Sequence, residues 1–591
     1  MAFRDSGMVD MHVVKRLRVA YAFVLAAMVI FGVRLFYVQI IRYDHYKQAA
    51  LSDQLKHFAI PASRGIISVH EAGATVPIVL NQRLYTLYAD PTFIKDPATA
   101  AAKVAGVTGG KVSDYEDLMR TKHTRYVVLA RKLSEDQSKS IAKLKLAGVG
   151  AEEQDYRTYP QGSMASQLLG FVNNDGVGTY GIEQALNNEL KGTPGQLKAI
   201  TDINGVPLAA SKNNTSVKPV AGKDILLTLD LSIQQQVETL LKNDVEHAKA
   251  TDGSAIVIDP NNGAIKAMAN YPTYDPSNYE NVDNADLFNN DSVSHPIEVG
   301  SIMKSLTTAA ALNVGAIKAD QTYYDPSHFK VDDFNITNIE EDGGAGVRSI
   351  ADILNLSLNT GATWELMQMG GGEINSKARN TWYDYMVNHY RFGRATGVEQ
   401  GYEATGYVPS PKNNGAGINL TYANTAFGQA MTATPIQMAA AFSAVMNGGT
   451  YYQPHLVDSM TDSTTGKVTV KQPVVLEKNV VSPKVGQELI PLLQNVVDKH
   501  YFVPGFDQSK YIVGGKTGTA QVAKPGGGYS DNIFNGTYIG FVGGDKVQYV
   551  IVVFMRHPTI GGYAGTAAAQ PLFGDIAHML INNSYVMPKA H

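Results

Sequence analysis

The chain contains the stretch Ser301-Ile-Met-Lys-Ser-Leu-Thr-Thr-Ala-Ala-Ala-Leu312, in which a serine and a lysine stand three residues apart at the start of an apolar run. Alanine and leucine favour helix, and the apolar residues recur at helical spacing. Residues at i and i+3 share one helical face, so Ser301 and Lys304 are expected to meet. A serine hydroxyl becomes a strong nucleophile when a neighbouring base takes its proton, and a lysine with a lowered pKa can be that base. Gly300 would let the backbone turn sharply before the serine, whose N–H at the helix start is free to bind an oxyanion.

A second short motif, Ser357-Leu-Asn359, lies further along the chain between apolar residues that are expected to hold it rigidly. The Ser357 hydroxyl can relay a proton between lysines and a leaving amine. The side-chain amide of Asn359 can hydrogen-bond the backbone of a peptide substrate. Alone, the motif would indicate only a helix N-cap serine with a nearby asparagine. Its functional interpretation therefore depends on the motifs on either side.

The third motif, Lys516-Thr-Gly-Thr519, follows an apolar, β-like approach and predicts the edge strand of a sheet. A strand edge presents N–H and C=O groups with which an extended peptide can pair. Gly518 removes the side chain that would block this approach.

The polar groups of this third motif fit the binding of a charged substrate. Lys516, Thr517 and Thr519 can bind a carboxylate, and the N–H of Thr519 would complete the oxyanion hole. If Lys516 comes close to Lys304, its charge would lower the pKa of that lysine. The three motifs, in this order along the chain, therefore indicate an acyl-transfer site.

Two of the motifs also occur elsewhere in the chain. S-x-x-K recurs at Ser140-Ile-Ala-Lys143, in a polar and charged helix, and S-x-N recurs at Ser211-Lys-Asn213 and Ser530-Asp-Asn532. The first S-x-N match precedes the nucleophile in a polar linker, and the second follows K-T-G in a glycine-rich loop. Motif order therefore favours Ser301 and Ser357.

The ordered motifs resemble those of the class B penicillin-binding proteins, which are membrane-anchored D,D-transpeptidases that cross-link peptidoglycan. Further resemblances lie at Arg64-Gly65, Tyr159-Pro160, Gly170-Phe171, Gly181-Ile-Glu183, Leu226 to Gln234, Ala255 to Pro272, Thr434-Pro-Ile-Gln437 and Asn447-Gly-Gly449. The resemblance implies the following roles: Ser301 is the nucleophile, Lys304 its base, Ser357 and Asn359 the proton-relay and substrate-binding pair, and Lys516 to Thr519 the strand that binds the substrate carboxylate.

The resemblance also implies an architecture. An α/β transpeptidase domain, similar to that of serine β-lactamases, would occupy about residues 221–591 as a five-stranded antiparallel sheet flanked by helices. Residues 42–220 would form an elongated α+β pedestal of the dimerisation type, without a transglycosylase motif. Residues 1–16 would be a cytoplasmic tail and residues 17–41 a transmembrane anchor. The family chemistry requires no cofactor and no metal.

The sequence departs from the family pattern at a few positions. The family usually has proline where this chain has Val299, and often has proline where it has Ser305. Neither position carries a reacting group, so altered rigidity is expected rather than lost chemistry. The pedestal run after Arg64-Gly65 also lacks the usual Asp-Arg-Asn-Gly turn.

The amino-terminal segment from Leu17 to Ile41 is long and apolar enough to cross a bilayer if Arg34 reaches the far interface. Lys15, Arg16 and Arg18 lie at its start, which predicts a cytoplasmic amino terminus and a catalytic domain outside the plasma membrane. The alternatives are a cleaved signal peptide, for which the run is long and lacks a small-x-small site, and a buried core helix.

Composition excludes several other classes of protein. The net charge of −4 gives no sign of nucleic-acid binding, and the chain has no cysteine, so disulfides, thiolate catalysis and Cys-ligated zinc are excluded. Neither H-E-x-x-H nor a phosphate-binding G-x-x-x-x-G-K-[ST] motif occurs.

Three functions fit the motifs. The first is a D,D-transpeptidase that acts on peptidoglycan stem peptides, binds β-lactams, and works with a membrane glycosyltransferase and division proteins. The run Ala426-Phe-Gly-Gln429 resembles division- or sporulation-type members more than the elongation type. The second is a serine β-lactamase, for which Glu183-Gln-Ala-Leu-Asn187 matches an E-x-x-L-N motif but precedes the nucleophile. The third is a non-catalytic scaffold of the cell-wall machinery.

Overall fold

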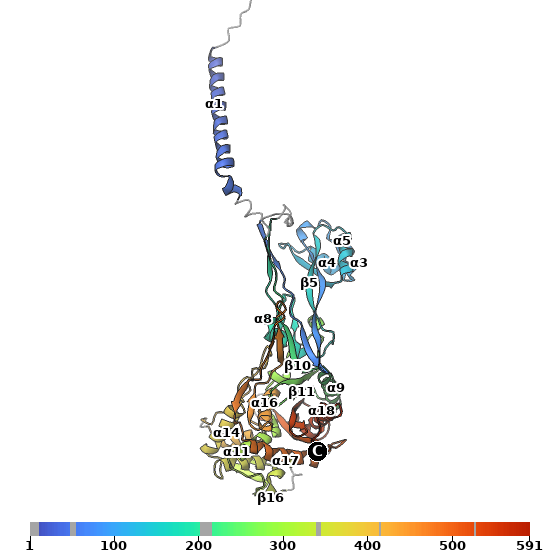
Figure 1. Ribbon diagram of the computed structural model, residues 1–591, viewed down its shortest axis with the longest axis vertical. Helices are drawn as coiled ribbons and strands as arrows, with labels where there is room; N and C mark the ends of the chain where they lie inside the picture. Colours follow the sequence, from blue (N-terminus) through green and yellow to red (C-terminus); the bar gives the residue numbers. More distant parts are fainter. Residues whose placement is uncertain are drawn as a thin grey trace, which may run out of the picture. The chain divides into compact units, whose positions relative to one another are not determined.

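Figure 1 shows the computed structural model, which describes residues 11–47, 55–200, 215–338, 344–412, 415–500, 502–524 and 528–590. The chain divides into two compact units, one of Met1–Ala62 with Thr193–Val220 and the other of Ser63–Gly192 with Ala221–His591. The S-x-N match at Ser211-Lys-Asn213 lies outside the described residues.

The first unit contains the expected amino-terminal helix. Helix α1 (Met11–Phe36) continues into the π-helical turn η1 (Tyr37–Ile41). Its apolar part, Val14–Ile41, spans 28 residues, about 42 Å at 1.5 Å per residue, which is enough to cross a bilayer. The helix starts before the predicted membrane segment because Lys15 and Arg16 are good helix formers. This unit also holds the three-stranded sheet β1 (Leu55–Ile60), β8 (Gly195–Ile200) and β9 (Thr215–Val217), in the order β1-β8-β9.

The second unit contains a seven-stranded sheet that draws strands from both sides of residue 220. Its order is β19-β18-β10-β2-β3-β4, with β5 also paired to β3. The strands are β2 (Ile67–Glu71), β3 (Ala74–Ala89), β4 (Val127–Leu133), β5 (Val149–Thr158), β10 (Asp224–Asp230), β18 (Val457–Thr461) and β19 (Val468–Val470). Strand β10 runs parallel to β2, with Ile225 opposite Ile67. The domain boundaries expected from the sequence remain predictions.

Three helices pack on strands β3, β4 and β5 in the pedestal. They are α3 (Pro97–Thr108), α4 (Val112–Met119) and α5 (Glu135–Lys143). Their buried residues, including Ala101, Val104, Met119 and Ile141, form a small separate core with Leu87 of β3. Shorter elements follow at α6 (Ser166–Leu169), β6 (Phe171–Val172), β7 (Gly178–Thr179), α7 (Gly181–Ala185) and α8 (Asn187–Leu190).

The second unit also holds the five-stranded antiparallel sheet that the resemblance implied, so that prediction is confirmed. Its order is β12 (Ile265–Tyr271), β11 (Asp252–Ile258), β23 (Val547–Arg556), β22 (Tyr529–Gly543) and β21 (Ile512–Ala523). Strand β21 lies at the edge, as expected for the third motif.

Helices cover both faces of this sheet, which explains why the central strands β11 and β23 are largely apolar. In β23, Val550, Val552 and Phe554 belong to one hydrophobic core, and the alternating residues Ile551 and Val553 belong to another. The first core includes residues of α11 (Met303–Asn313), α16 (Pro435–Met446) and α17 (Pro483–Lys499). The second includes residues of α9 (Leu231–Ala248) and α18 (Gln570–Asn582).

A helical lobe continues the first core around α11. It contains α12 (Ile350–Asn355), α13 (Asn359–Met369), α14 (Ser376–Asp384) and α15 (Ile418–Ala426). The small strand pairs are β13 (Thr322–Asp325) with β16 (Gly346–Ser349), β14 (His328–Val331) with β15 (Phe334–Thr337), and β17 (Thr450–Tyr452) with β20 (Val475–Lys478). The lobe brings α13, which begins with Asn359, next to α11.

Candidate active site

Ser301 lies in a tight turn directly before the central helix. The 3₁₀ turn η5 (Gly300–Ile302) leads into α11. Gly300 has φ +65°, a left-handed conformation that favours glycine, and a Cβ atom there would lie 2.9 Å from the carbonyl oxygen of Thr519. The predicted sharp turn at Gly300 is therefore confirmed, and it places the serine beside strand β21.

Lys304 joins the first two motifs. Its side chain is fully buried, and its Nζ donates to Ser301 Oγ at 3.0 Å, to Ser357 Oγ at 3.1 Å and to Asn359 Oδ1 at 2.8 Å. It also donates to the carbonyl oxygen of Ser357. The structure thus brings together four predicted site residues, which are Ser301 of η5, Lys304 of α11, Ser357 of the loop before α13 and Asn359 at the start of α13. When Lys304 is a free amine, its position lets it accept the Ser301 proton.

The backbone at Ser357 is strained. Ser357 has φ +56°, in the left-handed region that a non-glycine residue adopts at a cost of roughly 1–3 kcal/mol. The turn is held by the N–H of Leu358, which donates to the Ile353 carbonyl at 3.0 Å. This conformation lets both the hydroxyl and the carbonyl oxygen of Ser357 contact Lys304.

The third motif packs directly against the nucleophile turn. Lys516 is fully buried on β21, and its Nζ donates to the Thr517 carbonyl at 3.2 Å and to Thr517 Oγ1 at 3.3 Å. A Cβ atom at Gly518 would lie 2.9 Å from the Val299 carbonyl oxygen. Thr519 Oγ1 accepts the N–H of Gly565 at 3.0 Å. Four of the predicted residues therefore meet around Lys304, and the strand that carries the other four, Lys516 to Thr519, packs against the turn before Ser301.

Val299, one of the departures from the family pattern, keeps a backbone that proline could also adopt. Its φ is −77°, close to the angle that a proline ring fixes. Its carbonyl oxygen accepts the hydroxyl of Thr537 on β22 at 2.9 Å, which ties the nucleophile turn to the sheet. The other departure, Ser305, is fully buried on α11.

Two titratable residues near the site were missed by the sequence reasoning. Burial and the positive charge of Lys516 lower the pKa of His500, which follows α17. Glu365 is fully buried on α13, and burial raises its pKa to about 8. Its carboxyl accepts the Thr308 hydroxyl at 2.9 Å. Neither residue belongs to a sequence motif, so its position near the site could be found only from the fold.

The chance motif matches lie in different surroundings. Lys143 is exposed at the end of α5, and Ser530 lies on β22. Glu183 of the E-x-x-L-N match is fully buried and accepts from Arg64 Nε at 2.7 Å and from Arg157 Nε at 2.8 Å. The carboxylate of Glu183 is therefore part of a structural ion cluster.

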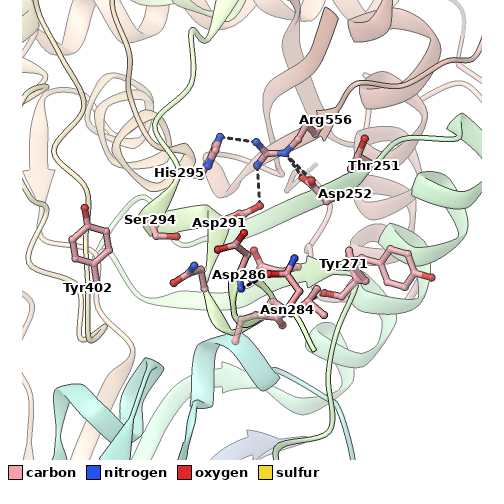
Figure 2. Close-up of a pocket in the computed structure, with 15 residues that line it drawn as sticks. Thr251, Asp252, Tyr271, Asn284, Asp286, Asp291, Ser294, His295, Tyr402 and Arg556 are labelled. Atoms are coloured by element: carbon pink, nitrogen blue, oxygen red, sulfur yellow. Dashed lines mark hydrogen bonds and ion pairs between the residues drawn. The ribbon is translucent and has the colours of Figure 1, made fainter. Parts of the chain in front are cut away.

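A separate polar cavity of about 610 Å³ lies beside the ends of β11, β12 and β23 (Figure 2). Arg556 at the end of β23 donates to Asp252 at 2.8 Å and to Asp291 at 3.0 Å, and it also contacts His295. None of the eight predicted site residues lines this cavity. Among the residues that the structure describes, no group of three or more His, Asp and Glu side chains is placed to hold a metal ion.

Comparisons with known proteins cover nearly the whole chain. Residues 253–578 match the penicillin binding protein transpeptidase domain, and residues 59–227 match the penicillin-binding protein dimerisation domain. Stage V sporulation protein D of Bacillus subtilis is 30% identical over 97% of this chain and 86% of its own length. Peptidoglycan D,D-transpeptidase FtsI of Escherichia coli is 24% identical over 94% of this chain and 90% of its own length.

Solved structures show the same fold. Penicillin binding protein 2X of Streptococcus thermophilus has a TM-score of 0.69 at 24% identity, covering 90% of this chain and 80% of that chain. Penicillin binding protein 3 of Mycobacterium tuberculosis, complexed with aztreonam, has a TM-score of 0.66 at 24% identity, covering 90% of this chain and 98% of that chain. Because the transpeptidase match spans more than half of the chain and the dimerisation match precedes it, the chain belongs to the class B penicillin-binding proteins.

Proposed function

We propose that this protein is a membrane-anchored serine D,D-transpeptidase that cross-links peptidoglycan stem peptides during septal wall synthesis and is acylated by β-lactams. The observation that carries the proposal is the contact of Lys304 with Ser301, Ser357 and Asn359 beside the open edge of β21. The names of the relatives, a sporulation protein and a peptidoglycan D,D-transpeptidase, support the same reaction and a septal setting.

The reaction has two halves. In the first, Lys304 takes the proton of Ser301 Oγ while that oxygen attacks the carbonyl carbon of the penultimate D-alanine. The N–H groups of Ser301 and Thr519 would hold the oxyanion. As the C–N bond breaks, a proton passes through Ser357 to the leaving D-alanine amine, which restores Lys304 as a base.

In the second half, an amine from a neighbouring stem peptide attacks the ester on Ser301. The amine nitrogen loses a proton to Lys304, the C–O bond breaks, and the Ser301 oxygen regains a proton. During both steps Lys516, Thr517 and Thr519 bind the substrate along β21, and Asn359 orients the peptide backbone.

The proposed cellular location of the enzyme rests on its amino-terminal segment. Helix α1 fits a single-pass membrane anchor. The basic residues Lys15, Arg16 and Arg18 at its start favour a cytoplasmic amino terminus and a catalytic domain outside the plasma membrane. We propose a membrane glycosyltransferase and division proteins as partners, because a cross-linking enzyme needs newly made glycan strands at the septum.

A β-lactamase is a weaker interpretation. Such an enzyme must activate water to hydrolyse its acyl-enzyme quickly, and the glutamate of the E-x-x-L-N match is Glu183. That carboxylate is occupied by Arg64 and Arg157 in the pedestal. A non-catalytic scaffold would not need Lys304 to contact Ser301.

Covalent labelling with a fluorescent penicillin tests the proposed function. The purified protein is compared with Ser301→Ala and with the matched control Ser140→Ala, which changes the serine of the other S-x-x-K match. We expect a persistent adduct in the wild type and in Ser140→Ala and none in Ser301→Ala. A folded wild type that forms no adduct would refute acylation, and rapid loss of the adduct would favour a β-lactamase.

A further inference from the structure

Glu298 stands just before the nucleophile turn, and its carboxyl group joins segments that lie far apart in the sequence. Its Oε1 accepts the hydroxyl of Tyr529 at 3.0 Å and the N–H of Ala430 at 2.9 Å. The other oxygen, Oε2, is buried and has no hydrogen-bond partner in the part of the chain that the structure describes. The reaction described above uses none of these residues.

The contact with Ala430 fixes the carboxyl group beside the nucleophile turn. The segment around Ala430 runs next to that turn, because the N–H of Gly300 donates to the Gly428 carbonyl at 3.0 Å. Ile297 and Ala433 also exchange two backbone hydrogen bonds, each of 3.0 Å. The carboxyl group is therefore held by the same two segments that shape the turn before the serine.

Tyr529 connects this carboxyl group to the far end of the edge strand. It is the first residue of β22, and it pairs with Ala523, the last residue of β21. The N–H of Lys524 donates to the Gly528 carbonyl at 2.9 Å, which continues the pairing beyond the two strands. The hydrogen bond between Tyr529 and Glu298 thus ties the end of β21 to the nucleophile turn.

This end of β21 lies where a substrate would extend away from its carboxylate. In the proposed reaction, Lys516 and Thr517 bind the carboxylate, and the N–H of Thr519 holds the oxyanion. The main chain of a substrate paired with the strand is therefore expected to continue from Thr519 toward Ala523. A penicillin carries its acyl side chain on the corresponding side of the carbonyl that Ser301 attacks, so that side chain would meet the same end of the strand.

We propose that Glu298 and Tyr529 are positioning residues that determine specificity: their hydrogen bond holds the far end of β21 in place, so that ligands with an acyl side chain along the strand react fastest. This inference rests on the proposed function. Without the tie, a ligand must order the end of the strand when it binds, which costs free energy. A ligand that lacks the side chain does not meet that end and avoids the cost.

The test compares the wild type with Tyr529→Phe in acylation by two β-lactams. One is a fluorescent penicillin with a large acyl side chain, and the other is the penicillin nucleus with a free amine in place of that side chain, measured by competition with the first. Tyr529→Phe removes only the hydroxyl group. We expect acylation by the fluorescent penicillin to slow roughly three- to tenfold and acylation by the nucleus to stay within about twofold of the wild type.

Three further variants separate this effect from a general loss of structure. Tyr271→Phe is the matched control, because its hydroxyl donates to Glu246 of α9 at 2.7 Å, and it should leave both rates unchanged. Glu298→Gln keeps an oxygen that can accept both hydrogen bonds, so it should retain the preference for the side chain. Glu298→Ala should lose that preference, and adding Tyr529→Phe to it should remove no more, because both changes delete the same hydrogen bond.

An unchanged preference in Tyr529→Phe would overturn the inference and leave the proposed function intact, since the wild type would still be acylated. Equal slowing with both β-lactams would also overturn it, because a contact along the strand acts only on the ligand with the side chain. If Tyr529→Phe does not fold, Glu298→Ala decides by the same comparison. A folded wild type that neither β-lactam acylates would refute the proposed function and this inference with it.

Discussion

In the pedestal, the fully buried carboxylate of Glu183 accepts hydrogen bonds from the guanidinium groups of Arg64 and Arg157. In the transpeptidase domain, by contrast, the fully buried amino group of Lys304 contacts oxygen atoms of the uncharged residues Ser301 and Ser357. Both sites bury an ionisable group. In the first, the group is paired with opposite charges, and in the second it contacts hydroxyl groups, which can both donate and accept hydrogen bonds. The pedestal cluster is therefore suited to stability, and the transpeptidase cluster is suited to proton transfer.

The largest expected effect is on the rate of acylation by a β-lactam, and it is expected from the substitution Lys304→Met. This change removes the proposed base while filling its space, so acylation should fall roughly a hundred- to ten-thousandfold. The folded state should lose little stability, because an apolar side chain of similar size replaces a buried polar amine. Acylation kinetics and denaturant unfolding measure the two effects. The matched control is Lys143→Met, in the exposed S-x-x-K match, which should change neither. A variant that acylates normally would contradict the role of Lys304.

The next effect is on stability and comes from Glu183→Ala in the pedestal. Two buried guanidinium groups would lose their counter-charge, which costs roughly 3–5 kcal/mol. Denaturant unfolding should show the loss, while the acylation rate of the remaining folded protein stays normal. Glu135→Ala is the control, because its partner Lys139, at 2.7 Å, forms an exposed pair on α5. Equal stability of the two variants would show that the pedestal cluster is not structural.

The smallest effect is expected from Gly300→Ala. Its left-handed backbone and the short approach of a Cβ atom to the Thr519 carbonyl should together cost roughly 1–3 kcal/mol. Because the strain falls on the nucleophile turn, acylation should slow as well. Gly315→Ala is the control: Gly315 has φ +69°, and a Cβ atom there would meet nothing within 4 Å. If both variants slow acylation equally, the contact with β21 does not position Ser301.

Much of the site could be predicted from the sequence because motif spacing determines local geometry. Ser301 and Lys304 meet because residues three apart lie on one face of the continuous helical segment η5–α11, and Gly300 makes the predicted sharp turn with a left-handed backbone. The prediction of a five-stranded antiparallel sheet came from the family resemblance, since the residue pattern of the strands does not by itself reveal their order or direction.

Other features of the site could not be predicted. The left-handed backbone of Ser357 has no local signal, because serine seldom adopts it and only the surrounding packing holds it there. Burial raises the pKa of Glu365, and burial together with the charge of Lys516 lowers the pKa of His500. Such long-range contacts form only when the chain has folded.

The seven-stranded sheet limits which fragments of this protein can be expected to fold. Strand β10 is hydrogen-bonded to β2 on one side and to β18 on the other, so the sheet joins the start of the pedestal to the part of the chain after residue 220. A fragment that begins at residue 221 would keep β10 but lose β2, and it would expose a new strand edge that can pair with other chains. A soluble form made for drug screening should therefore retain the pedestal strands, and any force on the pedestal would pass into the catalytic part through backbone hydrogen bonds.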